Sequence, residues 1–311
     1  MRPLRAPVAM YRAILKNMDY QEFRAKWDAA RGPVLDLVRR VEDRLTAKDA
    51  LGEAALVSEF PHFPFSPRLW RVWLGNTAKL QGVKRLDRFP YATHPTRMAL
   101  ICCWLIDEGK VREDSGVLAI VHDYLEEGDG LTKDGIDAMR RQFPEEAAAL
   151  VAGVVLSEPI VDYASLGRST ELSFWRRVAY VLQAKDAIEQ LGDQAFANAA
   201  LADKLDNLHD LDYIALDPRM TPEKRAMKLA HRLGYFRFVA RELGAFAAPA
   251  LRSMLERGIT NRTYEFGVSQ GDVDLSTDDL AERARGKRSV LTRMTKEYQS
   301  ALGLRLSASS I

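Results

Sequence analysis

The chain has 311 residues, of which 47% are hydrophobic and 28% are charged, close to the average for globular proteins. Lys and Arg total 45 against 43 Asp and Glu, so the formal net charge is only +2. This balance argues against non-specific nucleic-acid binding, and no uncharged apolar stretch approaches the roughly 20 residues that a membrane span requires.

The cysteines and the N-terminal sequence indicate the cellular compartment of the protein. The two cysteines are the neighbours Cys102 and Cys103, which lie in an apolar run and cannot form a disulfide framework. We expect both to be core residues of a protein kept in a reducing environment. The basic stretch 1–20 mixes charges into its apolar run and shows no signal-peptide cleavage site. The sequence therefore predicts a cytoplasmic protein.

Hydrophobic periodicity along the chain is that of helices. Residues 1–75 predict two or three short amphipathic helices, together with the segment 59–67, whose prolines and phenylalanines are incompatible with regular helix. Later segments repeat apolar residues at three- and four-residue spacing, namely residues 145–156, 172–182 and 197–211. We find no convincing run of alternating strands, so we expect an all-α fold.

The C-terminal third contains one helix with clear ends and one segment without helical signals. Thr221 is a typical N-cap, Pro222 fits the first turn, and the helical pattern stops near Gly244. Residues 258–275 are polar and rich in turn-forming types, and we expect a loop or a small hairpin there. The next helix is then expected to begin at Ser276, the first residue of a capping-box pattern.

Three short motifs carry residues that can bind a metal ion. His94 lies in PYATHP, His122 and Asp123 are adjacent in HDYLEE, and Asp203 lies in LADKLDN. Imidazole nitrogens and carboxylate oxygens from three predicted helices form the mixed donor set that suits Mn²⁺, Fe²⁺ or Zn²⁺. Such a cation can lower the pKa of bound water and neutralise the charge that develops during hydrolysis of a phosphate ester or anhydride.

Several residues near these motifs have both a functional and a structural interpretation. Glu126 and Glu127 follow the His-Asp pair by one helical turn, and a helix would direct them toward the same region. A carboxylate there can orient a water molecule or take its proton. Arg97 either touches phosphate or pairs with an acid. The remaining histidines are expected to be core residues: His62, His209 and His231.

The ordered motifs PYxxHP, HDxxEE and LADxLxNL resemble those of the HD-domain metal-dependent phosphohydrolases. Within that superfamily they are most similar to the hydrolase domain of the RelA/SpoT alarmone enzymes and to the small alarmone hydrolases. The resemblance implies an HD-domain helical bundle at residues 76–215, with a helical extension at 1–75 and another at 216–311 packed on the bundle. No β-rich synthetase sequence follows, so it implies an alarmone hydrolase without a synthetase domain.

The resemblance also implies roles for particular residues. The family's metal ligands, which usually hold Mn²⁺, with Fe²⁺, Zn²⁺ or Mg²⁺ as alternatives, correspond to His94, His122, Asp123 and Asp203. Glu126 and Glu127 correspond to the acidic pair that activates the attacking water. Arg85 corresponds to the arginine that packs on the guanine base, and Asn207 to the asparagine that contacts the nucleotide. The implied reaction, part of the stringent response, removes the 3′-pyrophosphate from ppGpp or pppGpp to give GDP or GTP.

The positions that depart from the family's pattern are ones expected to recognise the substrate. The residues before Pro90 differ, and Ala200 and Asp210 stand in place of a lysine and a threonine. Asp210 would share a helix face with Asp203 and Asn207, where an added acid should repel a phosphate-rich ligand. Two alternatives therefore stand beside ppGpp hydrolysis: an HD-type hydrolase of a different nucleotide, and a nucleotide-binding regulatory module without catalysis. The expected partner is a small-molecule nucleotide with a guanine base, not nucleic acid or a membrane, and the sequence predicts no oligomeric state.

Overall fold

A computed structural model describes residues 18–49, 52–85, 89–124, 132–146, 172–191 and 194–301. Within these ranges the regular structure is helical, apart from an isolated antiparallel bridge between Lys84 and Pro90. The all-α prediction is therefore confirmed. No helix in the described ranges combines the length and the apolar character needed to cross a bilayer.

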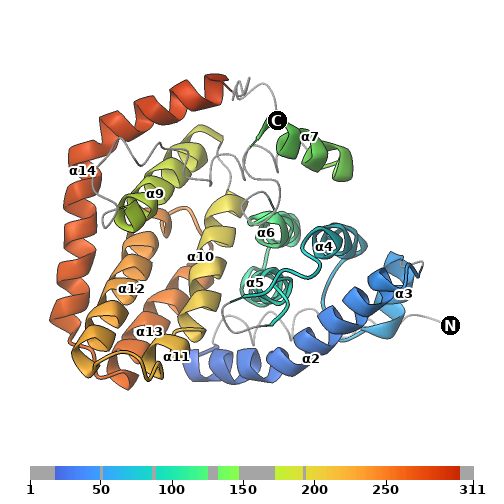
Figure 1. Ribbon diagram of the computed structural model, residues 1–311, viewed down its shortest axis with the longest axis horizontal. Coiled ribbons are helices and arrows are strands. Elements are labelled where there is room, and N and C mark those ends of the chain that lie inside the picture. Colours follow the sequence, from blue (N-terminus) through green and yellow to red (C-terminus); the bar gives the residue numbers. More distant parts are fainter. Residues whose placement is uncertain are drawn as a thin grey trace.

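Figure 1 shows how the helices of the described ranges are arranged. In chain order they are α2 (Tyr20–Thr46), α3 (Glu53–Glu59), α4 (Pro67–Lys79), α5 (Thr93–Leu105), α6 (Gly109–Val121), α7 (Lys133–Gln142), α9 (Leu172–Leu191), α10 (Gln194–His209), α11 (Asp212–Ala215), α12 (Pro222–Leu243), α13 (Pro249–Glu265) and α14 (Gln270–Ala301).

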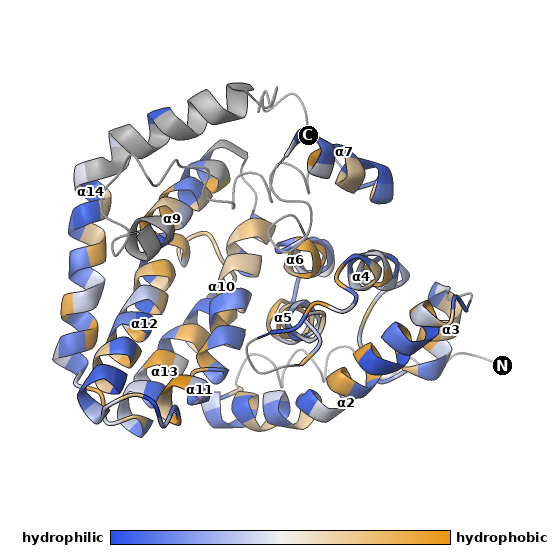
Figure 2. Ribbon diagram, viewed as in Figure 1, coloured by the Kyte–Doolittle hydropathy of each residue, from blue (hydrophilic) through white to orange (hydrophobic). Residues whose placement is uncertain are grey.

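Helix α10 lies between two groups of helices. On one side it packs against α5 and α6, and on the other against α9, α12 and α13, while α14 runs along the outside of α9 and α12 (Figure 1). Side chains of α10 are buried at nearly every position from Ala195 to His209, as expected for a helix enclosed by neighbours. Alanines make up much of its N-terminal half, and their small side chains let adjacent helices approach closely. Hydrophobic residues are prominent on α5 and α6, whereas hydrophilic residues are frequent on the coloured part of the outer helix α14 (Figure 2).

Local sequence signals placed several elements correctly. Helix α12 begins after Thr221, whose side chain accepts a hydrogen bond from the Lys224 amide, and ends at Leu243 with Gly244 as its C-cap. The proline- and phenylalanine-rich link is non-helical between α3 and α4, as predicted. Both cysteines are buried core residues. The predicted helix at 145–156 lies almost wholly outside the described residues.

Two predictions about the chain ends are wrong. Residues 20–46 form one 27-residue helix instead of short ones, and its internal Pro33 is exposed. The segment 258–275 is neither loop nor hairpin, because α13 continues to Glu265 and α14 begins at Gln270, with Ser276 inside it. Its polar residues are compatible with helix because most of them face solvent. Two are buried: Arg262 is neutralised by acids, and the Thr263 hydroxyl donates to the Ile259 carbonyl.

Candidate metal centre

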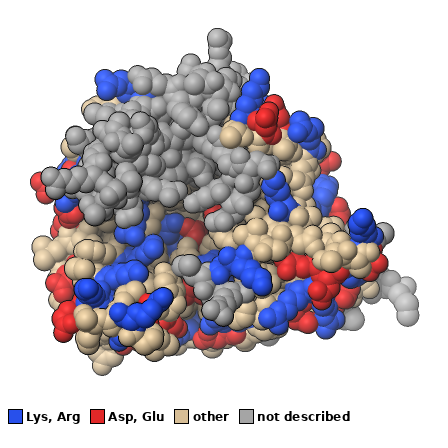
Figure 3. Space-filling model, in the orientation of Figure 1, with Lys and Arg blue, Asp and Glu red and all other residues tan. Residues whose placement is uncertain are grey.

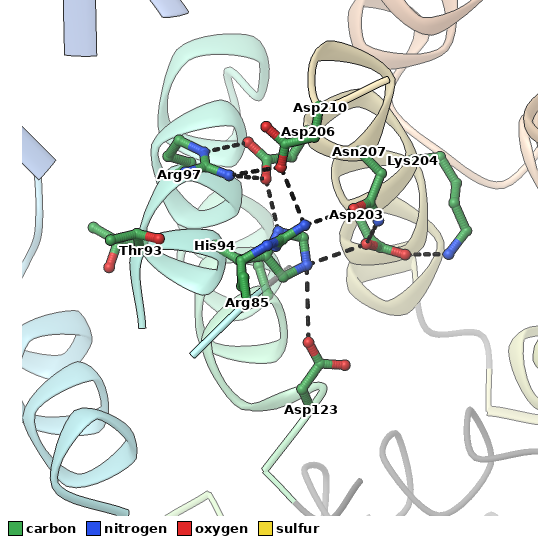
Figure 4. Close-up of polar contacts among 12 residues, drawn as sticks. Arg85, Thr93, His94, Arg97, Asp123, Asp203, Lys204, Asp206, Asn207 and Asp210 are labelled. Carbon is green, nitrogen blue, oxygen red and sulfur yellow. Dashed lines mark hydrogen bonds and ion pairs between the residues drawn. The ribbon is translucent and has the colours of Figure 1, made fainter. Parts of the chain in front are cut away.

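The four predicted metal ligands meet where α5, the end of α6 and α10 come together. Figure 4 labels three of them, His94, Asp123 and Asp203. One donor atom each from His94, His122 and Asp203 lies within 4.8 Å of the other two, which is close enough for a single ion. The carboxylate of Asp123 adjoins this group, since its Oδ2 lies 2.8 Å from His122 Nε2 and 3.8 Å from His94 Nε2. The structure thus brings together all four side chains from three separate segments.

Helix ends position three of these side chains. His94 is the second residue of α5, whose start is fixed by a 2.8 Å hydrogen bond from the Thr93 hydroxyl to the Pro90 carbonyl. His122 and Asp123 follow the last residue of α6 in a turn. Such placement leaves side chains at a helix terminus free to point toward a neighbouring element, here α10.

Each histidine is held through Nδ1, so that its Nε2 faces the carboxylates. His94 Nδ1 lies 2.7 Å from Asp206 Oδ2, and His122 Nδ1 lies 2.9 Å from the Ala119 carbonyl oxygen. Because a carboxylate and a carbonyl only accept, both Nδ1 atoms donate. His94 Nε2 lies 3.3 Å from Asp203 Oδ1. Fixing one imidazole nitrogen while the other points into the site is the usual arrangement of metal-binding histidines.

The carboxylate that holds His94 was not identified from the sequence. Asp206 is fully buried and accepts hydrogen bonds from Arg97 Nε and Nη2 and from Trp27 Nε1, at 2.8, 2.9 and 2.8 Å. Burial alone would raise the pKa of Asp206, but Arg97 and His94 hold it well below its usual range. Its position three residues after Asp203, on the same face of α10, is the signal that could have identified it.

Arg97 and Asp210 belong to the same network. Of the two roles expected for Arg97, the structure shows pairing with acids, since its Nη2 also lies 3.1 Å from Asp210 Oδ2. The Arg85 guanidinium lies 3.1 Å from the same Asp210 oxygen. Asp210 is therefore flanked by two cations and is not an isolated negative charge. Its expected repulsion of phosphate stays a prediction.

The two residues with predicted substrate contacts lie beside the ligands and bond to each other. Arg85 Nη2 donates to Asn207 Oδ1 at 3.1 Å, while Asn207 Nδ2 donates to Asp203 Oδ1. Lys204 Nζ donates to the other oxygen of Asp203, and the Tyr91 hydroxyl donates to Asp123 Oδ2 at 2.7 Å. Each ligand carboxylate thus has a neighbouring donor that orients it, as metal-binding carboxylates usually do.

The ionisable groups of the candidate metal centre shift one another's pKa values. Burial disfavours the charged form of His122, but attraction to Asp123 and a hydrogen bond that His122 donates to it, together with Asp203 and the Ala119 carbonyl, raise the pKa of His122 to about 9. Burial likewise opposes ionisation of Asp123, yet His122 and then His94 lower its pKa to about 2.

The remaining predicted residues divide into three groups. Glu126 and Glu127, the predicted acidic pair, lie outside the described residues. His209 is a buried core residue as predicted, stacked on Trp27 with ring centroids 4.6 Å apart. His62 and His231 are exposed, so their prediction as core residues is wrong. Each of the two occupies a solvent-facing position next to buried neighbours.

A cavity of about 470 Å³ adjoins the candidate metal centre. Tyr91, Lys204 and Asn207 line it, and each of these also bonds to Asp123 or Asp203. Five basic side chains contribute to its wall: Arg31, Lys84, Arg85, Lys204 and Arg232. Figure 3 shows Lys and Arg gathered over α12 and beside α10 in this region.

The acids in the cavity wall are Asp210 and Asp212, so basic groups outnumber acidic ones. Aromatic rings of Tyr213, Tyr235 and Phe236 complete the wall. Comparisons with protein-family models, with curated proteins and with solved structures found no match. The chemistry that the site can support is therefore inferred from its donor atoms and the residues around them.

Proposed function

We propose that the chain is a divalent-metal-dependent phosphohydrolase of a nucleotide, with an HD-type centre and with (p)ppGpp 3′-pyrophosphate hydrolysis as its reaction. One observation carries the proposal: two imidazole Nε2 atoms and two carboxylates converge beside a cavity with five basic side chains in its wall. A metal-binding group alone would suit many roles, and a basic cavity alone would suit any anion. Their adjacency favours chemistry on a phosphate.

The donor set fits a divalent cation. His94, His122, Asp123 and Asp203 offer two nitrogens and two carboxylates, a mixture that suits Mn²⁺ and also Fe²⁺ or Zn²⁺, and Mg²⁺ less well because of its preference for oxygen. When bound, such a cation would lower the pKa of coordinated water and neutralise charge that develops on phosphate.

Residues of the chain itself would orient the centre and the substrate. Asp206 would hold His94, and Tyr91 would hold Asp123, through the hydrogen bonds seen in the structure. Arg85 would be available to a nucleotide at the cavity wall, next to Asn207. Glu126 and Glu127 keep their proposed role of orienting the attacking water.

The aromatic residues of the cavity suit a base. Tyr213, Tyr235 and Phe236 line the cavity, and Tyr213 is exposed. A purine could stack on its ring, which would be worth roughly 1–3 kcal/mol per base. The basic residues in the same wall suit the phosphates. A nucleotide is therefore favoured over an inorganic phosphate or a phosphorylated sugar.

The direct test is to supply Mn²⁺ and ppGpp to the purified protein and to separate the products. We expect GDP and pyrophosphate as products. Asp203→Asn should lower the rate by more than roughly 100-fold, because the loss of a metal ligand should reduce activity more than the loss of a residue that orients a ligand. Asp36→Asn on α2, an exposed acid paired with Arg40, is the matched control. If another nucleotide is cleaved and ppGpp is not, the proposed substrate is wrong but the proposed class of reaction stands.

A nucleotide-binding module without catalysis is the second candidate. It is favoured by Lys204, whose ammonium already contacts Asp203 Oδ2 and so competes with a cation for that oxygen. Metal analysis separates the two functions. A protein that neither retains metal on purification nor binds added Mn²⁺, but binds ppGpp, would be a sensor or regulator.

A further inference from the structure

Two arginines from different helices stand close together on the side of the cavity formed by α12. Arg232 lies in α12 and lines the cavity. Arg177 lies in α9, with its guanidinium 5.4 Å from the centre of the Tyr235 ring. Burial and then repulsion from Arg232 lower the pKa of Arg177, which shows that the two positive charges interact.

Within the described ranges, no acid accompanies this pair as Asp206 accompanies Arg97 and Asp210 accompanies Arg85. Among the described residues, the charged and titratable groups that act on Arg177 are Arg232, Tyr235 and Tyr213, with no carboxylate. Arg232 Nε is buried and has no hydrogen-bond partner in the described part of the chain. A buried guanidinium N–H without an acceptor is costly, so an acceptor supplied by a ligand would relieve that cost.

The pair is linked to the candidate metal centre through a short series of side chains. Lys204 donates to the ligand Asp203, and its Nζ lies 5.5 Å from the centre of the same Tyr235 ring that Arg177 approaches. Arg232, Lys204 and Tyr235 therefore line one cavity beside the candidate metal centre, and Arg177 approaches the ring of Tyr235. A ligand that fills the cavity could reach both Arg232 and the metal centre.

We propose that Arg232, with the charge of Arg177 beside it, forms a second phosphate subsite that binds a phosphate group of the substrate other than the one cleaved. The substrate would then be a nucleotide with phosphate groups at two positions, one at the metal centre and one at Arg232. Guanidinium groups suit this role because their paired N–H donors match phosphate oxygens. The location of the cleaved group rests on the proposed function, whereas the subsite itself does not.

Metal-free protein provides the first test. Inorganic pyrophosphate is titrated into protein stripped with EDTA, and binding is followed by calorimetry at low and high salt. We expect binding that weakens with salt and that falls roughly tenfold or more in Arg232→Gln, the cost of losing a charge-assisted hydrogen bond. Lys224→Gln removes one positive charge from an exposed position of the same helix and should bind as the wild type does.

A second measurement uses turnover. Wild-type protein with Mn²⁺ should show a lower KM for ppGpp than for guanosine 3′-diphosphate, which lacks the 5′ phosphates. Arg232→Gln should raise KM for ppGpp and leave kcat and the KM for guanosine 3′-diphosphate unchanged. Arg232→Lys keeps the charge and should recover part of the loss, which a merely structural defect would not.

The outcomes distinguish this proposal from the proposed function. Pyrophosphate binding that is absent in the wild type, or unaffected by Arg232→Gln, overturns the subsite. Failure to cleave any nucleotide, with pyrophosphate binding still dependent on Arg232, overturns the hydrolase and leaves the subsite in place. If Arg232→Gln does not fold, Arg177→Gln repeats the titration, and unchanged binding there would also count against the pair.

Discussion

The two sides of the candidate site treat charge in opposite ways. Behind His94, the buried groups Arg97 and Asp206 are matched, with a bidentate ion pair and a further hydrogen bond from Trp27. On the α12 side of the cavity, Arg177 is repelled by Arg232 and no described acid pairs with either. Removing one partner of a matched buried pair leaves the other charge uncompensated, whereas an arginine without a described acid can take an anionic ligand as its partner. We therefore assign Arg97 and Asp206 to the scaffold of the site, and Arg232 and Arg177 to its binding surface.

The largest expected effect comes from breaking the matched side. Asp206→Ala would leave Arg97 buried at 4% exposure without its bidentate partner, which should cost about 3–5 kcal/mol of unfolding free energy. Urea denaturation measures it, and Asp36→Ala, which breaks an exposed pair with Arg40, should change stability by less than about 1 kcal/mol. Similar values for the two variants would contradict the assignment of Asp206 to the scaffold.

A milder change on the same side tests the connection to the metal. Asp206→Asn keeps the shape but can no longer hold His94 Nδ1 with a charged acceptor. Mn²⁺ affinity of the EDTA-stripped protein should fall about 10- to 100-fold, as for other partners of metal-binding histidines. Calorimetric titration gives the value. If the affinity does not change, the Nδ1 hydrogen bond does not prepare the ligand.

A neutral histidine beside the matched network should make stability depend on pH. Burial and then Arg262 lower the pKa of His209 to about 3; Asp206 opposes this, and Arg24 and Arg97 add to it. The unfolded chain, with a His pKa near 6.5, therefore binds the proton more readily than the folded chain. Stability from this residue is present above about pH 6.5 and is lost progressively as the pH falls toward 3, by about 2 kcal/mol at pH 5.

His209→Phe provides the measurement for this prediction. Phenylalanine can occupy the stack on Trp27 and removes a buried Nε2 that has no partner among the described residues. Relative to the wild type, the variant should gain about 2 kcal/mol between pH 7.5 and pH 5 in urea titrations. A constant difference between the two proteins across that range would show that His209 titrates as an ordinary histidine.

The sequence predicted the matched side only in part. His94 was identified because its motif is local. Asp206 was missed since an acid in a helix is usually on a solvated face, and its partner Arg97 is 109 residues away. The length of α13 was missed for a related reason, because Arg262 reads as a surface residue until its acid partners are located.

The arginine pair on the unmatched side could not be predicted from the sequence. Arg177 and Arg232 are unremarkable charges in amphipathic helices, and they become informative only when α9 and α12 pack together. The same holds for Tyr235, which meets Lys204 only in the fold. A missing partner is a property of three-dimensional arrangement, so no local pattern in the sequence can report it.

The smallest expected effect is also the one that most directly separates the two sides. If Arg232 serves a ligand and not the fold, Arg232→Gln should leave the ligand-free protein equally stable or more stable by up to about 1 kcal/mol, because repulsion with Arg177 is relieved. Any gain should shrink as salt screens the pair. Urea titrations at low and high salt measure both. A loss above about 1 kcal/mol would place Arg232 with Asp206 in the scaffold, whereas stability gained together with pyrophosphate binding lost is the signature of a residue kept for its ligand.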